Sequence, residues 1–141
     1  MAFKRFKGKT KVIYLPVKVS QAFTAGAIVS IGTGGDAGTV IPATSSTTAL
    51  SHIGVIVKDI ASTDSDYATA RKVPIEVPVE RNVEWLGDVT SGLVAADIGL
   101  EVDLTDSLTI NRGATSVKVA MVTGVISTTK GLFDIKFKAS Y

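Results

Sequence analysis

The chain has 141 residues, of which 45% are hydrophobic and 20% charged, enough for one domain with its own core and unlike a disordered tail. It contains no cysteine, which excludes disulfides, cysteine-ligated metals and cysteine nucleophiles. The net charge of +2 is uneven, because six of the fifteen basic residues precede the first acid, Asp36, and the remaining nine face thirteen acids.

The first dozen residues, MAFKRFKGKTKV, are strongly basic and contain two aromatic side chains. The residues concerned are Phe3, Lys4, Arg5, Phe6, Lys7, Lys9 and Lys11. The charge shift predicts a basic N-terminal arm over residues 1–14 and a single β-rich domain over residues 15–141, which we expect to fold without residues 1–9. Such an arm suits docking on an acidic protein surface, binding to nucleic-acid phosphates, or solubility alone. Lysines interrupt its apolar character, so a secretory signal is not expected, and no apolar run approaches the ~18 residues of a membrane span.

The rest of the chain reads as β-structure. Short runs rich in Val, Ile and Thr alternate with turns that contain Gly or Asp, which is typical of a small all-β barrel or sandwich. Strands are expected at Lys11–Val19, Ala27–Ile31, Thr39–Pro42, Ile53–Ile60, Val73–Arg81, Glu101–Leu104, Leu108–Asn111, Ser116–Val122 and Leu132–Lys138.

Two segments carry more specific expectations. In VPIEVPVE, from Val73 to Glu80, the aliphatic side chains alternate with Pro and Glu, so the aliphatic side should be buried. Its two prolines predict an edge strand or an unpaired stretch, because proline donates no hydrogen bond to a ladder. A short helical turn is expected within Thr90–Asp97, where Ser91 is a suitable cap.

An internal similarity suggests duplication. The stretch AGAIVSI…GTVIPATSSTTALSHIGVIV resembles IGLEVDL…DSLTINRGATSVKVAMVTGVIS, and each holds a glycine, a strand, a turn, a second strand and a Gly-Val-Ile strand. The comparison equates Gly26 with Gly99 and Gly54 with Gly124. It predicts two copies of one β-unit joined by the proline-containing strand, with chance similarity in Val/Thr/Gly-rich sequence as the competing explanation.

Possible chemical motifs do not fit their mechanisms. GTGGDA, from Gly32 to Ala37, follows a strand, but the β-branched residues and proline after it exclude the helix that a dinucleotide site needs, and a hairpin loop is expected. His52 lacks a nucleophile-elbow motif and is expected in a solvated turn. The acids Asp59, Asp64 and Asp66 lack the spacing of an EF-hand loop. We therefore predict no catalytic residues, no cofactor and no metal, whereas Trp85 suits either a core or an interface.

The Gly and aliphatic pattern resembles a known family. The stretch VTSGLVAADIGLEVDL (residues 89–104), with the Gly-Val pairs at Gly54-Val55 and Gly124-Val125, is similar to small β-rich decoration (cement) proteins of tailed-bacteriophage heads. The resemblance covers about residues 15–138, and the basic arm lies outside it.

The resemblance implies a non-enzymatic protein on the outer surface of the virion capsid. Such proteins bridge major capsid subunits, commonly as trimers, and stabilise the shell. The expected partners are then the major capsid protein and further copies of this chain, with no membrane and no nucleic acid, and the seven arm residues from Phe3 to Lys11 become the capsid-binding site. Two alternatives stay open: another virion component, such as a tail-tube, head-completion or receptor-binding part, and a small protein whose basic arm binds nucleic acid.

Overall fold

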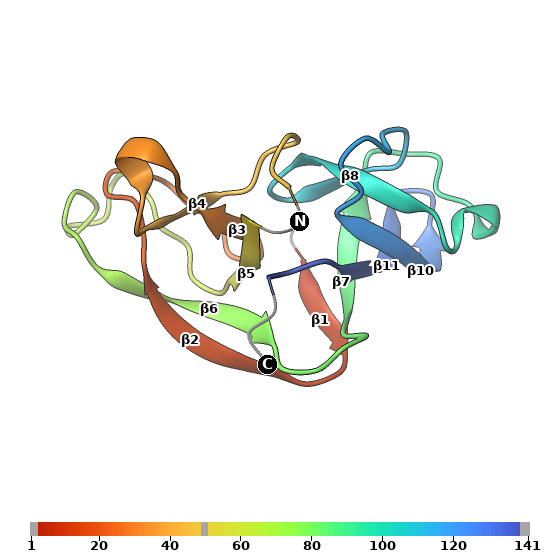
Figure 1. Ribbon diagram of the computed structural model, residues 1–141, viewed down its shortest axis with the longest axis horizontal. Helices are drawn as coiled ribbons and strands as arrows, with labels where there is room; N and C mark the ends of the chain where they lie inside the picture. Colours follow the sequence, from red (N-terminus) through yellow and green to blue (C-terminus); the bar gives the residue numbers. More distant parts are fainter. Residues whose placement is uncertain (1–2, 49–50, 139–141) are drawn as a thin grey trace.

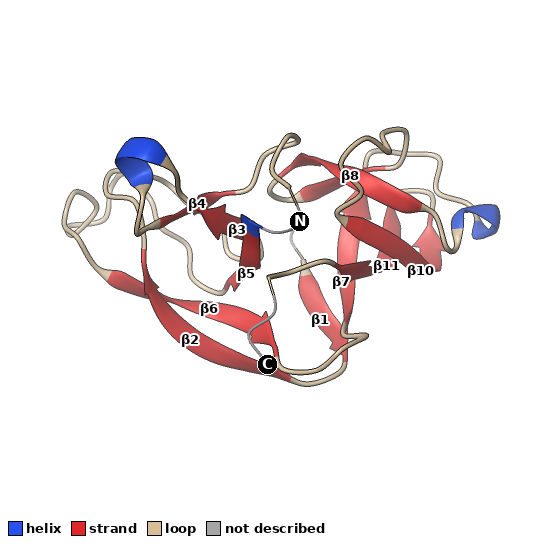
Figure 2. Ribbon diagram, in the orientation of Figure 1, coloured by secondary structure: helices blue, strands red, loops and turns tan. Residues whose placement is uncertain are grey.

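A computed structural model describes residues 3–48 and 51–138, and their regular structure is almost entirely β-strand (Figures 1 and 2). The strands are β1 (Lys4–Lys7), β2 (Thr10–Pro16), β3 (Ile28–Ile31), β4 (Val40–Pro42), β5 (His52–Ile56), β6 (Lys72–Pro78), β7 (Glu84–Val89), β8 (Glu101–Asp106), β9 (Thr109–Asn111), β10 (Ala120–Ser127) and β11 (Lys130–Ile135). Two 3-10 turns, η1 (Gly34–Asp36) and η3 (Ala95–Asp97), accompany them. The all-β prediction is confirmed.

One sheet closes into a small barrel. Its strand order is β1-β7-β11-β10-β8-β9, and β9 also pairs with β7. That last pairing is parallel and places Asp88 opposite Thr109 and Val89 opposite Ile110. This closing contact covers only the Asp88–Val89 end of β7, and β1 pairs with the remaining edge of β7 at Glu84–Leu86.

The other sheet has the order β2-β6-β5-β3-β4. Its two ends approach each other at a single parallel bridge between Val17 and Val40. In Figure 1 it forms the left half of the molecule, with β2 along the lower rim and β6 on the inner side of β2. We call β2–β6 the first unit and β7–β11 the second unit.

The two units share one topology, as the internal similarity predicts. In chain order β2 to β6 correspond to β7 to β11, and each unit has the same neighbour order. The closing contacts also correspond. The Lys18 N–H donates to the Val40 carbonyl at 3.1 Å, as the Thr90 N–H donates to the Ile110 carbonyl at 3.0 Å.

The register corrects two details of that prediction. Gly54 lies opposite Val29 as Ala120 lies opposite Val102, so the structural equivalent of Gly54 is Ala120, and not Gly124. Gly54 is required because a Cβ there would lie 2.4 Å from the Glu76 carbonyl oxygen. The proline-containing strand does not join the units either, since it is β6, inside the first unit.

Strand β6 is central, which overturns the edge-strand expectation. Its alternation is as predicted for Val73, Ile75 and Val77, which are buried. It ends there, because Pro78 is buried and Val79 is only partly buried. The prolines are tolerated because of the direction in which their main-chain groups point. The Val57 N–H donates to the Pro74 carbonyl at 3.2 Å, so the polar groups of Pro74 face the β5 side. The ladder with β5 covers only Ile75 and Glu76, so neither proline lies at a position where an N–H would have to donate to β5.

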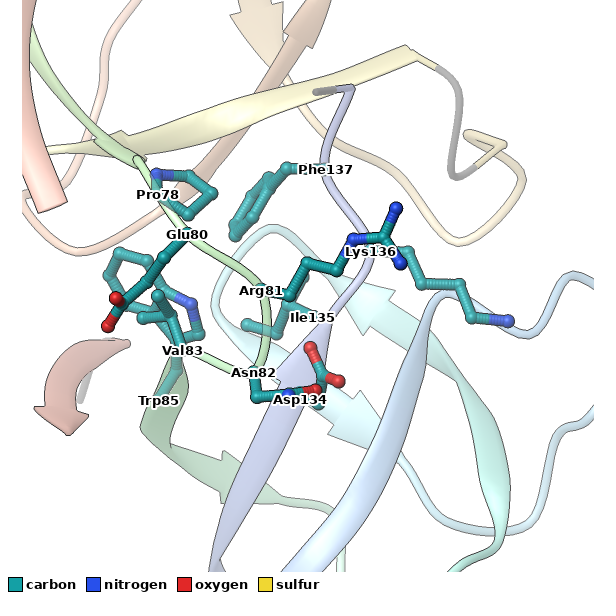
Figure 3. A pocket seen from close by; sticks show the side chains of 10 residues that line it. All are labelled: Pro78, Glu80, Arg81, Asn82, Val83, Trp85, Asp134, Ile135, Lys136 and Phe137. Atoms are coloured by element: carbon teal, nitrogen blue, oxygen red, sulfur yellow. The ribbon is translucent and has the colours of Figure 1, made fainter. Parts of the chain in front are cut away.

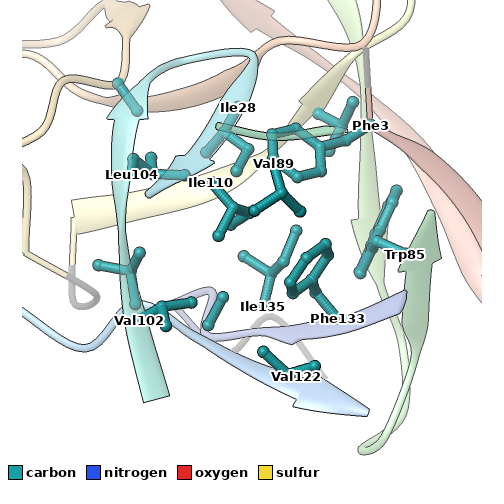
Figure 4. Close-up of a cluster of buried hydrophobic side chains, with 14 of the residues drawn as sticks. Phe3, Ile28, Trp85, Val89, Val102, Leu104, Ile110, Val122, Phe133 and Ile135 are labelled. Atoms are coloured by element: carbon teal, nitrogen blue, oxygen red, sulfur yellow. The ribbon is translucent and has the colours of Figure 1, made fainter. Parts of the chain in front are cut away.

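Two hydrophobic clusters form the core. The cluster in Figure 4 lies mainly in the second unit around the fully buried Trp85 and Phe133. It also contains Ile28, Ala43 and Val55 of the first unit. The units are therefore packed into one body, in agreement with a shared core.

Part of the second unit differs from the expected elements. Strand β7 was not expected, and it places Trp85 in the core. The expected helical turn over Thr90–Asp97 is reduced to η3, and Ser91 caps nothing there, because the N-cap position belongs to Val94.

Candidate binding surface

The basic N-terminal segment is built into both sheets. Strand β1 pairs antiparallel with β7, with Arg5 opposite Trp85, and β2 pairs with β6 along its whole length. Phe3 is only 3% exposed, and its N–H donates to the Gly26 carbonyl at 2.9 Å. This corrects the expectation of a separate arm over residues 1–14, at least for the described residues 3–14.

Burial of the Phe3 ring explains why β1 is held against β7. A Cβ at Gly87 would lie 2.4 Å from the Phe3 ring, so the ring occupies the space that the missing side chain leaves. Phe3 belongs to the core and is not available as a capsid anchor. Removal of residues 1–9 would therefore take away a core side chain and uncover the edge of β7, and we now expect it to destabilise the body.

Arg5 is also engaged within the molecule. Its Nε lies 3.4 Å from Glu76 Oε2, and its Nη1 donates to the Gly8 carbonyl at 3.0 Å. The same Glu76 carboxylate accepts a hydrogen bond from the Thr10 hydroxyl. Arg5 thus ties β1 to the first unit, and its charge is partly balanced by Glu76.

The other five predicted residues are exposed, and we call them the basic rim: Lys4, Phe6, Lys7, Lys9 and Lys11. The Phe6 side chain is 56% exposed. None of the four lysines has an ion pair within residues 3–48 and 51–138. The segment therefore presents four exposed lysines without an ion pair in the described residues, and one aromatic ring, along β1, β2 and the connection between them.

Sequence reasoning missed two apolar neighbours of the basic rim. Val12 and Tyr14 of β2 are 51% and 62% exposed, although they lie inside the apolar run VIYLPV. A run that is apolar on both faces hides which face is solvated. Only the register with β6 shows that Ile13 and Leu15 face the core and that Val12 and Tyr14 do not.

His52 is buried, which contradicts the solvated-turn expectation. It opens β5 with no exposed surface, and neither ring nitrogen has a hydrogen-bond partner among the described residues. Burial lowers the pKa of His52 to about 4, with the main chain of Lys136 as a smaller opposing influence. A neutral imidazole sealed from solvent has no substrate to act on.

The three acids of the 59–66 loop serve local structure. Asp59 accepts the Ala25 N–H at 2.7 Å, and Asp66 forms an ion pair with Arg71 at 2.7 Å. Asp64 lies 4.0 Å from the same guanidinium. No group of three potential metal ligands occurs among the described residues.

The glycine-rich motif is a hairpin loop, as predicted. Gly34 to Asp36 form η1 between β3 and β4, and Gly34 and Gly38 have φ angles of 58° and 85°. A Cβ at Gly32 would lie 2.3 Å from the Asp36 carbonyl oxygen, so this glycine lets the loop close. Nothing here supplies the long helix N-terminus of a dinucleotide site.

A polar cavity of about 250 Å³ lies between the 78–83 connection and β11 (Figure 3). Arg81, Lys136, Glu80 and Asp134 contribute its charges, and Trp85 forms part of its wall. Burial raises the pKa of Asp134 above its ordinary value. The lining contains neither a hydroxyl nor an imidazole, and its one amine, on Lys136, is held in an ion pair with Glu101.

No protein-family model matches the chain, and no curated protein sequence matches it either. Within the described residues, no helix combines the length and hydrophobicity that a membrane span requires.

Proposed function

We propose that this protein is a non-enzymatic decoration protein of a tailed-phage capsid. In this proposal it binds the outer surface of the assembled head, bridges major capsid subunits and stabilises the shell, as a trimer. The observation that carries the proposal is the basic rim, whose four exposed lysines form no ion pair in the described residues and accompany the exposed Phe6. The family resemblance described above supports it.

The rim suits docking on an acidic protein shell. Lysine charges raise the association rate, and a half-exposed aromatic ring supplies apolar area at the contact. Both lie on strands that the sheets already order, so binding costs little further conformational entropy. A two-unit body with a shared core is also a stiff spacer between neighbouring capsid subunits.

Co-sedimentation with purified heads that lack the protein tests the proposal. The wild-type chain should sediment with heads in a fixed ratio at moderate salt. Lys4→Glu with Lys7→Glu should weaken attachment by at least tenfold. Lys58→Glu with Lys138→Glu, a matched reversal at exposed lysines outside the rim, should leave it unchanged. Absence of wild-type binding to heads would exclude decoration.

Nucleic-acid binding is the second candidate. The observation that favours it is that two exposed aromatic rings accompany the rim lysines: Phe6 lies between Lys4 and Lys7, and Tyr14 follows Lys11. Aromatic rings stack on bases, and lysines neutralise phosphates. The same sedimentation assay with DNA decides between the two. Binding to DNA alone, weakened steeply by added salt, would favour this candidate over decoration.

A further inference from the structure

The two units differ at one edge. In the second unit, β1 covers the outer edge of β7, with Lys4 opposite Leu86 and Lys7 opposite Glu84. The equivalent strand of the first unit is β2, because Ile13 lies opposite Ile75 of β6 as Trp85 lies opposite Phe133 of β11. Among the described residues no strand lies along the corresponding part of β2.

The main-chain groups at this edge point outward. Pro74 lies opposite Tyr14 and its carbonyl faces β5, so Tyr14 exchanges no hydrogen bonds with β6 across this pair. Directions alternate along a strand, and Val12 therefore also turns its N–H and C=O away from β6. Lys18 lies an even number of residues after Val12 and Tyr14, so its N–H points to the same side as theirs. It donates to the Val40 carbonyl, on the side away from β6. Beyond that contact, the edge of β2 at Val12 and Tyr14 is open.

The exposed side chains at this edge suit an added strand. Val12 and Tyr14 point to the same face and are half or more exposed, whereas their equivalents, Glu84 and Leu86, are partly covered beside β1. β-branched and aromatic residues form favourable cross-strand pairs. In Figure 1 β2 lies on the rim of the molecule, with β6 on one side only.

Charge selects the occupant. The chain has no acid before Asp36, so a second copy pairing through β2 would offer Lys9 and Lys11 no acidic partner. Edge lysines are a common means by which proteins prevent such self-pairing. Edge lysines attract a strand with acidic residues instead. Lys9 and Lys11 lie at the N-terminal end of β2, where they can contact such residues.

We infer that the outer edge of β2, at Val12 and Tyr14, accepts an extended segment of the capsid protein as an added antiparallel strand. That segment carries apolar side chains facing Val12 and Tyr14 and acidic side chains beside Lys9 and Lys11. The inference rests on the proposed function for the identity of the partner, and on the repeat and the strand register for the site.

Val12→Pro isolates the main-chain contact. It removes an N–H that β6 does not use, and proline is tolerated on an edge strand whose N–H faces outward. Loss of one hydrogen bond, with the partner's carbonyl left unpaired, should weaken attachment to heads about tenfold. Val12→Thr keeps the N–H and the β-branched shape and should bind heads within about twofold of the wild type. Urea unfolding of both variants checks that the body is intact.

Hydrogen exchange on the wild-type chain provides a readout that needs no variant. The Glu84 amide, which faces β1, should be protected in the free protein, whereas the Val12 and Tyr14 amides should exchange fast and become protected on heads. Protection of Val12 and Tyr14 in the free protein, together with dimers in sedimentation equilibrium, would assign the edge to a second copy and overturn the inference.

The outcomes separate the two proposals. Wild-type binding with equal binding of a folded Val12→Pro, or with no protection of the Val12 and Tyr14 amides, overturns the strand-addition inference and leaves decoration standing. Absence of wild-type binding overturns decoration, and the inference, which names the capsid protein, fails with it.

Discussion

Acidification should weaken the fold through His52. The imidazole is fully buried, and burial lowers the pKa of His52 from 6.5 to about 4. As the pH falls, the unfolded chain takes up a proton near pH 6.5, and the folded chain does so only near pH 4. The unfolded state therefore binds more protons across this window. The stabilising contribution of the neutral His52 is fully present above pH 6.5, and the free energy of unfolding decreases as the pH falls toward 4.

The expected loss follows from the size of the shift. A change in pKa from 6.5 to about 4 corresponds to about 3 kcal/mol in total, because one pH unit is worth about 1.4 kcal/mol. At pH 5 the loss should be about 2 kcal/mol, a substantial part of the 5–15 kcal/mol typical of a native domain. The pKa of Glu101 is lowered by the Lys136 ammonium and that of Asp97 by the Arg112 guanidinium, so these carboxylates contribute only at still lower pH.

Urea unfolding at pH 7.5, 6.5, 5.5 and 5.0, followed by the fluorescence of the sole tryptophan, Trp85, measures this loss. The chain has one histidine, so no other imidazole contributes. His52→Leu places an apolar side chain of similar size in the core and removes the titrating imidazole. Its free energy of unfolding should change little between pH 7.5 and 5.0. A wild-type free energy of unfolding that is constant over this range, or an equal decrease in His52→Leu, would refute the reasoning.

Two further predictions concern stability. Phe3→Ala should lower the free energy of unfolding by about 3–5 kcal/mol, because Phe3 is buried in the larger cluster, whereas Phe6→Ala should change it by no more than about 0.5 kcal/mol. Equal effects of the two substitutions in urea unfolding would contradict the placement of β1. Asp103→Ala should cost about 3 kcal/mol or more, because the buried Asp103 carboxylate accepts the N–H groups of Ser116, Val117 and Lys118 at 2.7–3.0 Å. Thermal unfolding that is unchanged by Asp103→Ala would show that water satisfies these donors equally well.

The sequence predicts the β-class and most strand positions because β-branched alternation is a local property. Strand β7 escapes it, because Leu86 stands on the more exposed side and Gly87 on the buried side, so the buried set Trp85, Gly87 and Val89 is not the more apolar one throughout. Glycine is a poor strand former, and nothing in the local sequence explains Gly87. Its reason lies in the ring of Phe3, far away in the chain, which fills the space above it.

In the candidate site, too, local sequence predicts which residues are involved but not which of them are exposed. Composition identifies the seven basic and aromatic residues, and all of them except Phe3 are exposed. Phe3 and Phe6 have the same type of neighbours in the sequence, yet one is in the core and the other is half exposed. Local pattern cannot separate them, because the difference depends on which strand β1 joins. The open edge at Val12 and Tyr14 is likewise visible only when the two units are compared strand by strand.

The pairing of β1 with β7 competes with a simpler structure, a β-hairpin of β1 and β2. Only Gly8 and Lys9 separate β1 from β2, and a two-residue connection ordinarily joins neighbouring strands of one hairpin. Such a hairpin would cover Val12 and Tyr14 with the chain's own β1. It would also withdraw Phe3 from the core, where burial of such a ring contributes about 1.5–3 kcal/mol, and uncover the edge of β7. Phe3 over Gly87 therefore decides two features at once, because it closes the edge of the second unit and, by holding β1 away, leaves the edge of the first unit open to another chain.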